Sequence, residues 1–156
     1  MRTLLNIDLW PFAADFYQRP GVADACLAIQ AQGGNVCLLL AVCWLGTRGV
    51  RFDADRMATL QAVATPWHEH VITPLRGVRI AWREACEGDQ GWVGLREQVK
   101  TLELNAERML LERLQNLAEN WSAGEEEDLE AWLEAAMPHP QRDEGALRVL
   151  REALRP

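Results

Sequence analysis

The sequence predicts an all-α protein, a compact multi-helix bundle around an apolar central helix. Apolar residues recur every three or four positions along most of the 156-residue chain, which is the period of an amphipathic helix. Segment 36–47 is apolar on every side, as expected of a helix at the centre of a bundle. A buried strand is the alternative for this segment, but no second strand pattern exists with which it could pair.

Capping and helix-breaking residues bound the first three helices. Asp8 stands where an N-cap is expected and predicts a first helix over 9–19, which a Pro-Gly pair ends. Apolar residues at helical spacing from Val22 onward predict a second helix, which the pair Gly33-Gly34 ends. Asn35 then follows as the N-cap of the central helix.

Prolines divide the next helical segment. Either Asp53 or Asp55 caps a fourth helix, which we expect to bend at Pro66 because proline cannot donate a backbone hydrogen bond. Pro74 is expected to begin a fifth helix, over 75–86, which a Gly-bounded polar loop ends.

The rest of the chain predicts one long helix and two shorter ones. The long helix spans 92–121, about eight turns. Ser122 begins a capping-box pattern that predicts a weaker helix through Met137. A Pro-His-Pro sequence then breaks the chain before a last amphipathic helix over 142–154.

Charge and composition exclude several classes of protein. We expect a helical bundle domain over 1–121 and an acidic C-terminal helical extension over 122–156, packed on or near the bundle. The net charge of −7 argues against nucleic-acid and anionic-membrane partners, which attract clustered Lys and Arg. The longest apolar run is about half the roughly 20 residues that a membrane-spanning helix needs, and Asp8 interrupts any signal region. A cytoplasmic location is therefore expected.

Patterns of metal ligands, cofactor sites and nucleophiles are absent from the sequence. The four cysteines form no C-x-x-C pair and are expected to be small buried thiols. His68 and His70 flank Glu69, but two positions apart on a helix they lie on nearly opposite faces. We expect no metal and no cofactor, and the sequence leaves catalysis undecided.

A few ionisable residues fall on helix faces that should be buried. Glu103 lies within the apolar stripe of the long helix, to which Leu95 and Leu102 also belong, and a carboxylate there must be paired, hydrogen-bonded or protonated. On the neighbouring helices, His68 shares the apolar face and three arginines share one flank. The candidate polar cluster between the fourth, fifth and sixth helices comprises His68, Arg76, Arg79, Arg83, Glu103 and Glu107.

Two interpretations of this cluster stay open. In one, it is a pocket in which the arginines hold a small anionic molecule and His68 or Glu103 moves a proton. In the other, it is an ion-pair network that fixes the register of the helices. A cavity lined by these side chains favours the pocket, whereas direct pairing of Arg with Glu and no cavity favours the network.

The C-terminal extension indicates an interaction with a protein partner or with a second copy of the chain. Its apolar stripe is too narrow to stabilise a helix alone, so it must dock on a surface. This candidate interaction arm comprises Leu129, Trp132, Leu133 and Met137. Docking within the same chain is the alternative. The leading hypothesis is a protein-interaction module without catalysis, and an Arg/Glu/His pocket for a small anion, in a binding protein or an enzyme, is the runner-up.

Several short segments carry a resemblance. They are Asp8 to Ala13 with Tyr17, Gly21-Val22, Cys26-Leu27, Gln30, the apolar third helix ending Cys43-Trp44-Leu45, Trp67, Pro74 to Arg76 with Arg79, and Lys100 to Glu107. Together they resemble an uncharacterised family of small all-helical bacterial proteins, a domain of unknown function. The resemblance covers roughly residues 8–118 and fades in the acidic tail. It implies a cytoplasmic helical protein and transfers no activity.

Overall fold

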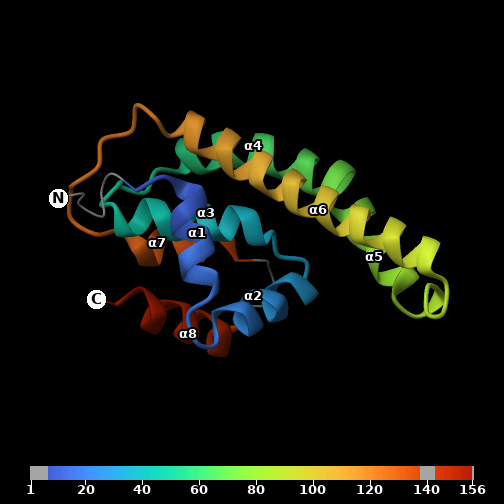
Figure 1. Cartoon of the computed structure of the whole chain (residues 1–156). Coiled ribbons are helices and arrows are strands. Elements are labelled where there is room, and N and C mark those ends of the chain that lie inside the picture. Colours follow the sequence, from blue (N-terminus) through green and yellow to red (C-terminus); the bar gives the residue numbers. More distant parts are fainter. Residues whose placement is uncertain (1–6, 138–142, 156) are drawn as a thin grey trace.

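The computed structural model describes residues 7–137 and 143–155, and every regular element in these ranges is a helix. The prediction of an all-α bundle is thus confirmed (Figure 1). The elements, in which η2 is a short π-helix, are α1 (Leu9–Tyr17), α2 (Val22–Ala31), α3 (Val36–Thr47), α4 (Ala54–Trp67), η2 (His68–Ile72), α5 (Thr73–Ala85), α6 (Gln90–Leu117), α7 (Leu129–Ala136) and α8 (Glu144–Leu154).

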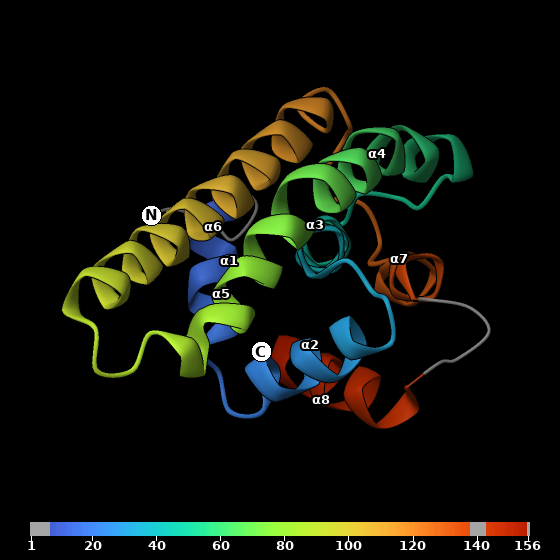
Figure 2. The ribbon, with the colours of Figure 1, turned by 90° about the vertical axis from the view of Figure 1, so that its right-hand side faces the viewer.

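Helix α3 lies at the centre of the bundle, as its apolar sequence predicts. It contacts α1, α2, α4, α6 and α7, whereas α2 and α8 pack against each other below it (Figure 2). Asn35 caps α3, because its side-chain oxygen accepts a hydrogen bond from the Leu38 amide at 3.2 Å. The start of α1 is held differently: Asp8 occupies the N-cap position, but the amide of Leu9 donates to Gln115 Oε1 on α6 at 2.8 Å.

Helices α4 and α5 follow each other without a loop, through η2, and α5 begins at Thr73, with Pro74 in its first turn, close to the predicted start. Asp53 caps α4 by accepting from the amides of Asp55 and Arg56. The π-helical segment η2 lies between Pro66 and Pro74. At the end of η2 the amide of Thr73 donates to the His68 carbonyl five residues earlier, which is the hydrogen bond of a π turn.

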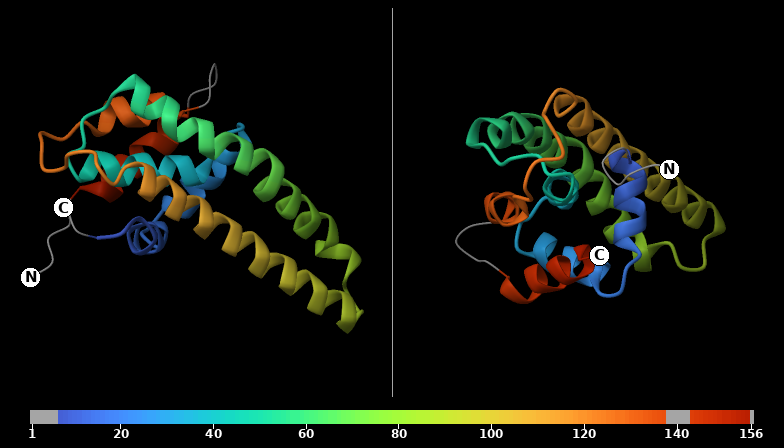
Figure 3. Two further views of the ribbon diagram at one scale, coloured as in Figure 1. Left: turned by 90° about the horizontal axis from the view of Figure 1, so that it is seen from above. Right: turned by 90° about the vertical axis from the view of Figure 1, so that its left-hand side faces the viewer.

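The α5–α6 hairpin projects beyond the rest of the bundle (Figures 1 and 3). No α5 residue is buried, and Leu95 and Leu102 are 52% and 53% exposed, although both belong to the stripe predicted to face the core. The prediction fails here because α5 is the main partner of this half of α6, so only part of the apolar stripe is covered. Trp82 and Trp92 meet edge to face near the hairpin's tip.

The chain between α6 and α7 is not helical, which corrects two further predictions. Helix α6 ends at Leu117, and α7 begins only at Leu129, so Ser122 caps no helix. Instead, the amides of Gly124 and Glu125 donate to the carbonyls of Arg48 and Gly49. These hydrogen bonds satisfy the backbone of the segment without a helix.

The candidate interaction arm is buried within the chain. Leu129, Trp132, Leu133 and Met137 all belong to the apolar core, because α7 packs on α3. The Trp132 indole donates to the Val50 carbonyl at 2.9 Å. These side chains therefore dock on the bundle of their own chain. Among the described residues, no helix combines the length and apolarity that crossing a membrane requires.

Candidate functional site

Glu103 is buried at the base of the α5–α6 hairpin and is bound by two arginines of α5. Arg79 donates through Nε to Oε1 at 2.5 Å and through Nη2 to Oε2 at 3.3 Å. Arg76 Nε donates to Oε2 at 3.3 Å. The hydrogen bond that Arg79 donates to Glu103 raises the pKa of Arg79. These bonds compensate the carboxylate for the water it has lost, so this half of the polar cluster is an ion-pair network.

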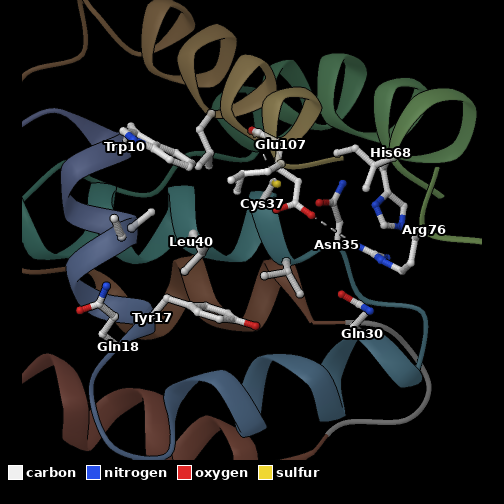
Figure 4. A pocket seen from close by; sticks show the side chains of 16 residues that line it. Trp10, Tyr17, Gln18, Gln30, Asn35, Cys37, Leu40, His68, Arg76 and Glu107 are labelled. Carbon is white, nitrogen blue, oxygen red and sulfur yellow. Dashed lines mark hydrogen bonds and ion pairs between the residues drawn. The ribbon is translucent and has the colours of Figure 1, made fainter. Parts of the chain in front are cut away.

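A pocket of about 320 Å³ lies beside that network, bounded by α1, α2, α3, η2, α5 and α6 (Figure 4). Three members of the predicted polar cluster line it: His68, Arg76 and Glu107. The remaining lining residues are Trp10, Ala13, Ala14, Tyr17, Gln18, Gln30, Asn35, Val36, Cys37, Leu40, Ile72, Leu104 and Leu111. The cluster therefore combines a network and a cavity, which the sequence analysis treated as alternatives.

One part of the pocket wall is apolar. Trp10 of α1, Leu40 of α3 and Leu111 of α6 supply most of its large side chains. Arg108 lies over the Trp10 ring, 5.2 Å from its centroid, and helps to hold that ring in place. An apolar wall of this kind favours a ligand with a hydrocarbon body.

Polar groups with unused hydrogen-bonding capacity line the other part of the pocket. The side chains of Tyr17, Gln30 and His68 make no hydrogen bond with any group that the structure describes. The Glu107 carboxylate points into the cavity, and its ion pair is a long one, 3.9 Å from Oε1 to Arg76 Nη2 (Figure 4). Asn35 differs, because its amide is already bonded to α3 and α4. Such convergent free groups are typical of a ligand site.

The electrostatics of the pocket single out Glu107. Burial, and after it the repulsion from Glu103, raise the Glu107 pKa to about 7, although Arg76 and Arg79 act in the opposite direction. Burial and then the charge of Arg76 lower the pKa of His68. Glu107 is therefore half protonated near neutral pH, and His68 is uncharged there.

Two neutral groups complete the surroundings of Glu107. Burial raises the pKa of the Cys37 thiol and of the Tyr17 hydroxyl, and the negative charge of Glu107 acts in the same direction on both. Neither group ionises at neutral pH, so both present only neutral hydrogen-bonding atoms to the pocket.

Arg83 is the member of the predicted polar cluster that the structure leaves outside. It shares a helix face with Arg76 but lies two turns, about 10 Å, farther toward the tip of the hairpin. Its side chain is exposed and has no ion pair within the described part of the chain. A helical wheel shows on which face of its helix a residue lies. It does not show whether the neighbouring helix extends far enough to contact that residue.

Sequence reasoning did not place Trp10, Tyr17, Gln30, Asn35 or Cys37 in a site. They come from three different helices, counting Asn35 as the N-cap of α3, and no local motif marks them. The one signal was the family resemblance, which included Trp10, Tyr17 and Gln30 without giving them a role.

The described residues contain no cluster of side chains that could bind a metal ion. No three His, Cys, Asp or Glu side chains in 7–137 and 143–155 gather where they could hold a metal ion. The four cysteines are buried and unpaired, as the sequence predicts.

Comparison with known proteins assigns the chain to a family. A family model described as a protein of unknown function (DUF2390) matches residues 8–114. The matched region contains every residue that lines the pocket, whereas α7 and α8 lie outside it. No curated protein and no solved structure matches the chain.

Proposed function

We propose that this chain, which belongs to the DUF2390 family of proteins of unknown function, binds a small organic molecule in the pocket between α1, α3, η2 and α6. The ligand has an apolar body that lies against Trp10 and Leu111. Its polar head meets Arg76, His68 and Glu107. A volume of about 320 Å³ is at the lower end of the usual range for ligand pockets, which favours a small molecule over a peptide.

One observation carries the proposal: hydrogen-bonding groups from four separate elements converge on the cavity, and their side chains make no hydrogen bond to the described part of the protein. Tyr17 comes from α1, Gln30 from α2, His68 from η2 and Glu107 from α6. These groups are accessible from the cavity and are not occupied by hydrogen bonds to protein atoms, so their donors and acceptors are available to a ligand. The π-helical segment adds support, because π turns are frequent at functional sites and this one presents His68 to the cavity.

The expected protein-interaction module stays a prediction with less support. Its candidate residues, among them Trp132 and Leu133, are buried against the chain's own core and offer no free surface. The pocket is therefore the better basis for a function.

A fragment screen followed by protein NMR tests the proposal. Ala14→Phe places a ring at an exposed position that lines the pocket, and Ala58→Phe makes the same change at an exposed position on α4. Fragments with an apolar body and a polar head should shift amide signals around the pocket in the wild type and in Ala58→Phe, but not in Ala14→Phe. Binding that Ala14→Phe leaves unchanged, or fragments that shift no pocket signal, would overturn the proposal.

A further inference from the structure

We propose that the ligand is a monocarboxylate whose head lies between Arg76, His68 and Glu107, and that the protein takes up one proton, on Glu107, when the ligand binds. This inference rests on the proposed function and adds the chemical class of the ligand. It also predicts a dependence of affinity on pH that a purely apolar cavity would not have.

The first support is the unused side of the Arg76 guanidinium. Its Nε donates to Glu103, which does not line the cavity, at 3.3 Å. Its Nη2 lies 3.9 Å from Glu107 Oε1, which is beyond hydrogen-bond distance. The terminal nitrogens of Arg76 thus keep donors for a ligand at the cavity wall (Figure 4). A planar carboxylate is the group that such a fork of donors binds best.

The second support is the charge balance of the groups that face Glu107. Arg76 and Arg79 reach it from α5, and Glu103 lies one turn away on its own helix. The formal charges of these four groups sum to zero. His68 from η2, Cys37 from α3 and Tyr17 from α1 are neutral at neutral pH, since burial moves each pKa toward the uncharged form.

With this charge balance, the residues around Glu107 bind an anion more readily than a cation. A bound carboxylate would add one negative charge, which a proton on Glu107 cancels at little cost because its pKa is already about 7. A bound amine would add one positive charge beside Arg76 and Arg79, and arginine does not lose its proton in proteins. Glu107 can offset either head group by taking up or releasing its proton, but the permanently charged guanidinium of Arg76 attracts a carboxylate head and repels an ammonium head, so the cluster favours an anion.

Protonated Glu107 also supplies the donor that the ligand needs. Its hydroxyl donates to one oxygen of the ligand carboxylate, while Arg76 donates to the other. Hydrogen bonds from a neutral acid to a carboxylate are short and strong. The proton comes from the solvent, and no covalent bond forms or breaks.

Titration calorimetry with matched probes tests the inference. The probes are 3-phenylpropanoate, 3-phenylpropanamide and 3-phenylpropylamine, which share one apolar body and differ in the charge of the head. We expect the carboxylate to bind the wild type at least tenfold more tightly than the amide or the amine at pH 6. Runs in two buffers of different ionisation enthalpy should report an uptake of close to one proton at pH 8.

The pH dependence of ligand affinity tests whether Glu107 is the group that takes up the proton. With a Glu107 pKa of about 7, the protonated fraction falls about tenfold between pH 6 and pH 8, so the wild-type affinity should fall by about the same factor. Glu107→Gln keeps a neutral donor and should bind 3-phenylpropanoate with an affinity that no longer changes with pH. Glu97→Gln, an exposed carboxylate on the same helix, should behave as the wild type.

The outcomes distinguish the two proposals. Equal or tighter binding of the amine or the amide, or no proton uptake by the wild type, overturns the inference and leaves the proposed pocket standing. If none of the three probes binds while fragments of another class do, the inference also fails alone. If neither the probes nor any fragment shifts the signals of pocket residues, both proposals fail. The proton count uses the wild type, so the test stands even where Glu107→Gln does not fold.

Discussion

The guanidinium of Arg79 on α5 binds both carboxylate oxygens of Glu103 on α6, through Nε and Nη2. This pair fixes the hairpin at the height of the pocket, because Arg76, one turn away from Arg79, shares the same carboxylate. Arg96 adds a hydrogen bond from its Nε to the Arg79 carbonyl at 3.0 Å. The position of Arg76 at the cavity wall therefore depends on an ion pair behind it.

We predict that Glu103→Gln lowers the free energy of unfolding by about 2–3 kcal/mol, because two largely buried guanidinium groups lose their charged acceptor. Urea denaturation monitored by circular dichroism measures this loss. Glu97→Gln removes an exposed carboxylate from the same helix and should change stability by less than about 0.5 kcal/mol. Equal losses in the two variants would contradict a structural role for Glu103.

Glu107 should make the fold less stable as the pH rises. The folded chain keeps this proton up to about pH 7, whereas the unfolded chain loses it near 4.5. The folded state thus holds more protons between these values, and its stability falls over that window. One pKa unit corresponds to about 1.4 kcal/mol, so with allowance for partial exposure the loss from pH 5 to pH 8 is about 2 kcal/mol.

Denaturation of Glu107→Gln at the same pH values isolates this effect. The variant cannot titrate at position 107, so the difference in stability between variant and wild type should grow from pH 5 to pH 8 in favour of the variant. A difference that does not change with pH would show that Glu107 titrates as it does in water.

Alanine substitutions at two glycines should change the stability of the fold in opposite directions. A methyl group at Gly46 of α3 would lie 2.8 Å from Leu129 Cα, so Gly46→Ala must push α7 away and should cost about 1–3 kcal/mol. A methyl group at Gly77 of α5 meets nothing within 4 Å, so Gly77→Ala should stabilise its helix by about 0.5–1 kcal/mol. Melting temperatures measure both effects, and a Gly46→Ala protein as stable as the wild type would contradict the close approach of α3 and α7.

Trp132 should contribute more to stability than the tryptophans of the hairpin. It is fully buried and donates to the Val50 carbonyl, so Trp132→Leu should cost about 3 kcal/mol or more. Trp82→Leu makes the same change at a half-buried site near the hairpin's tip and should cost about 1 kcal/mol. Chemical denaturation compares them, and a mild effect at Trp132 would indicate that α7 is only loosely attached.

Local signals in the sequence predicted the helices well and their partners less well. The cap at Asn35 and the all-round apolar character of α3 were correct because both depend on residues close together in the chain. The capping box at Ser122 was wrong because a distant loop, at Arg48 and Gly49, takes the backbone hydrogen bonds of that segment. Leu95 and Leu102 were misplaced because periodicity does not show where a neighbouring helix ends.

The candidate site shows the same difference between what local sequence signals predict and what helix packing decides. The sequence by itself determined that Glu103 faces the interior, since an acidic residue within an apolar stripe needs a partner, and it named Arg76 and Arg79 as candidates. Only the tertiary structure decided that His68, Arg76 and Glu107 face a cavity that Tyr17 and Gln30 also line. The physical reason is that a pocket is the space left between helices, and that space depends on how far apart their axes pack and not on the pattern along any one of them.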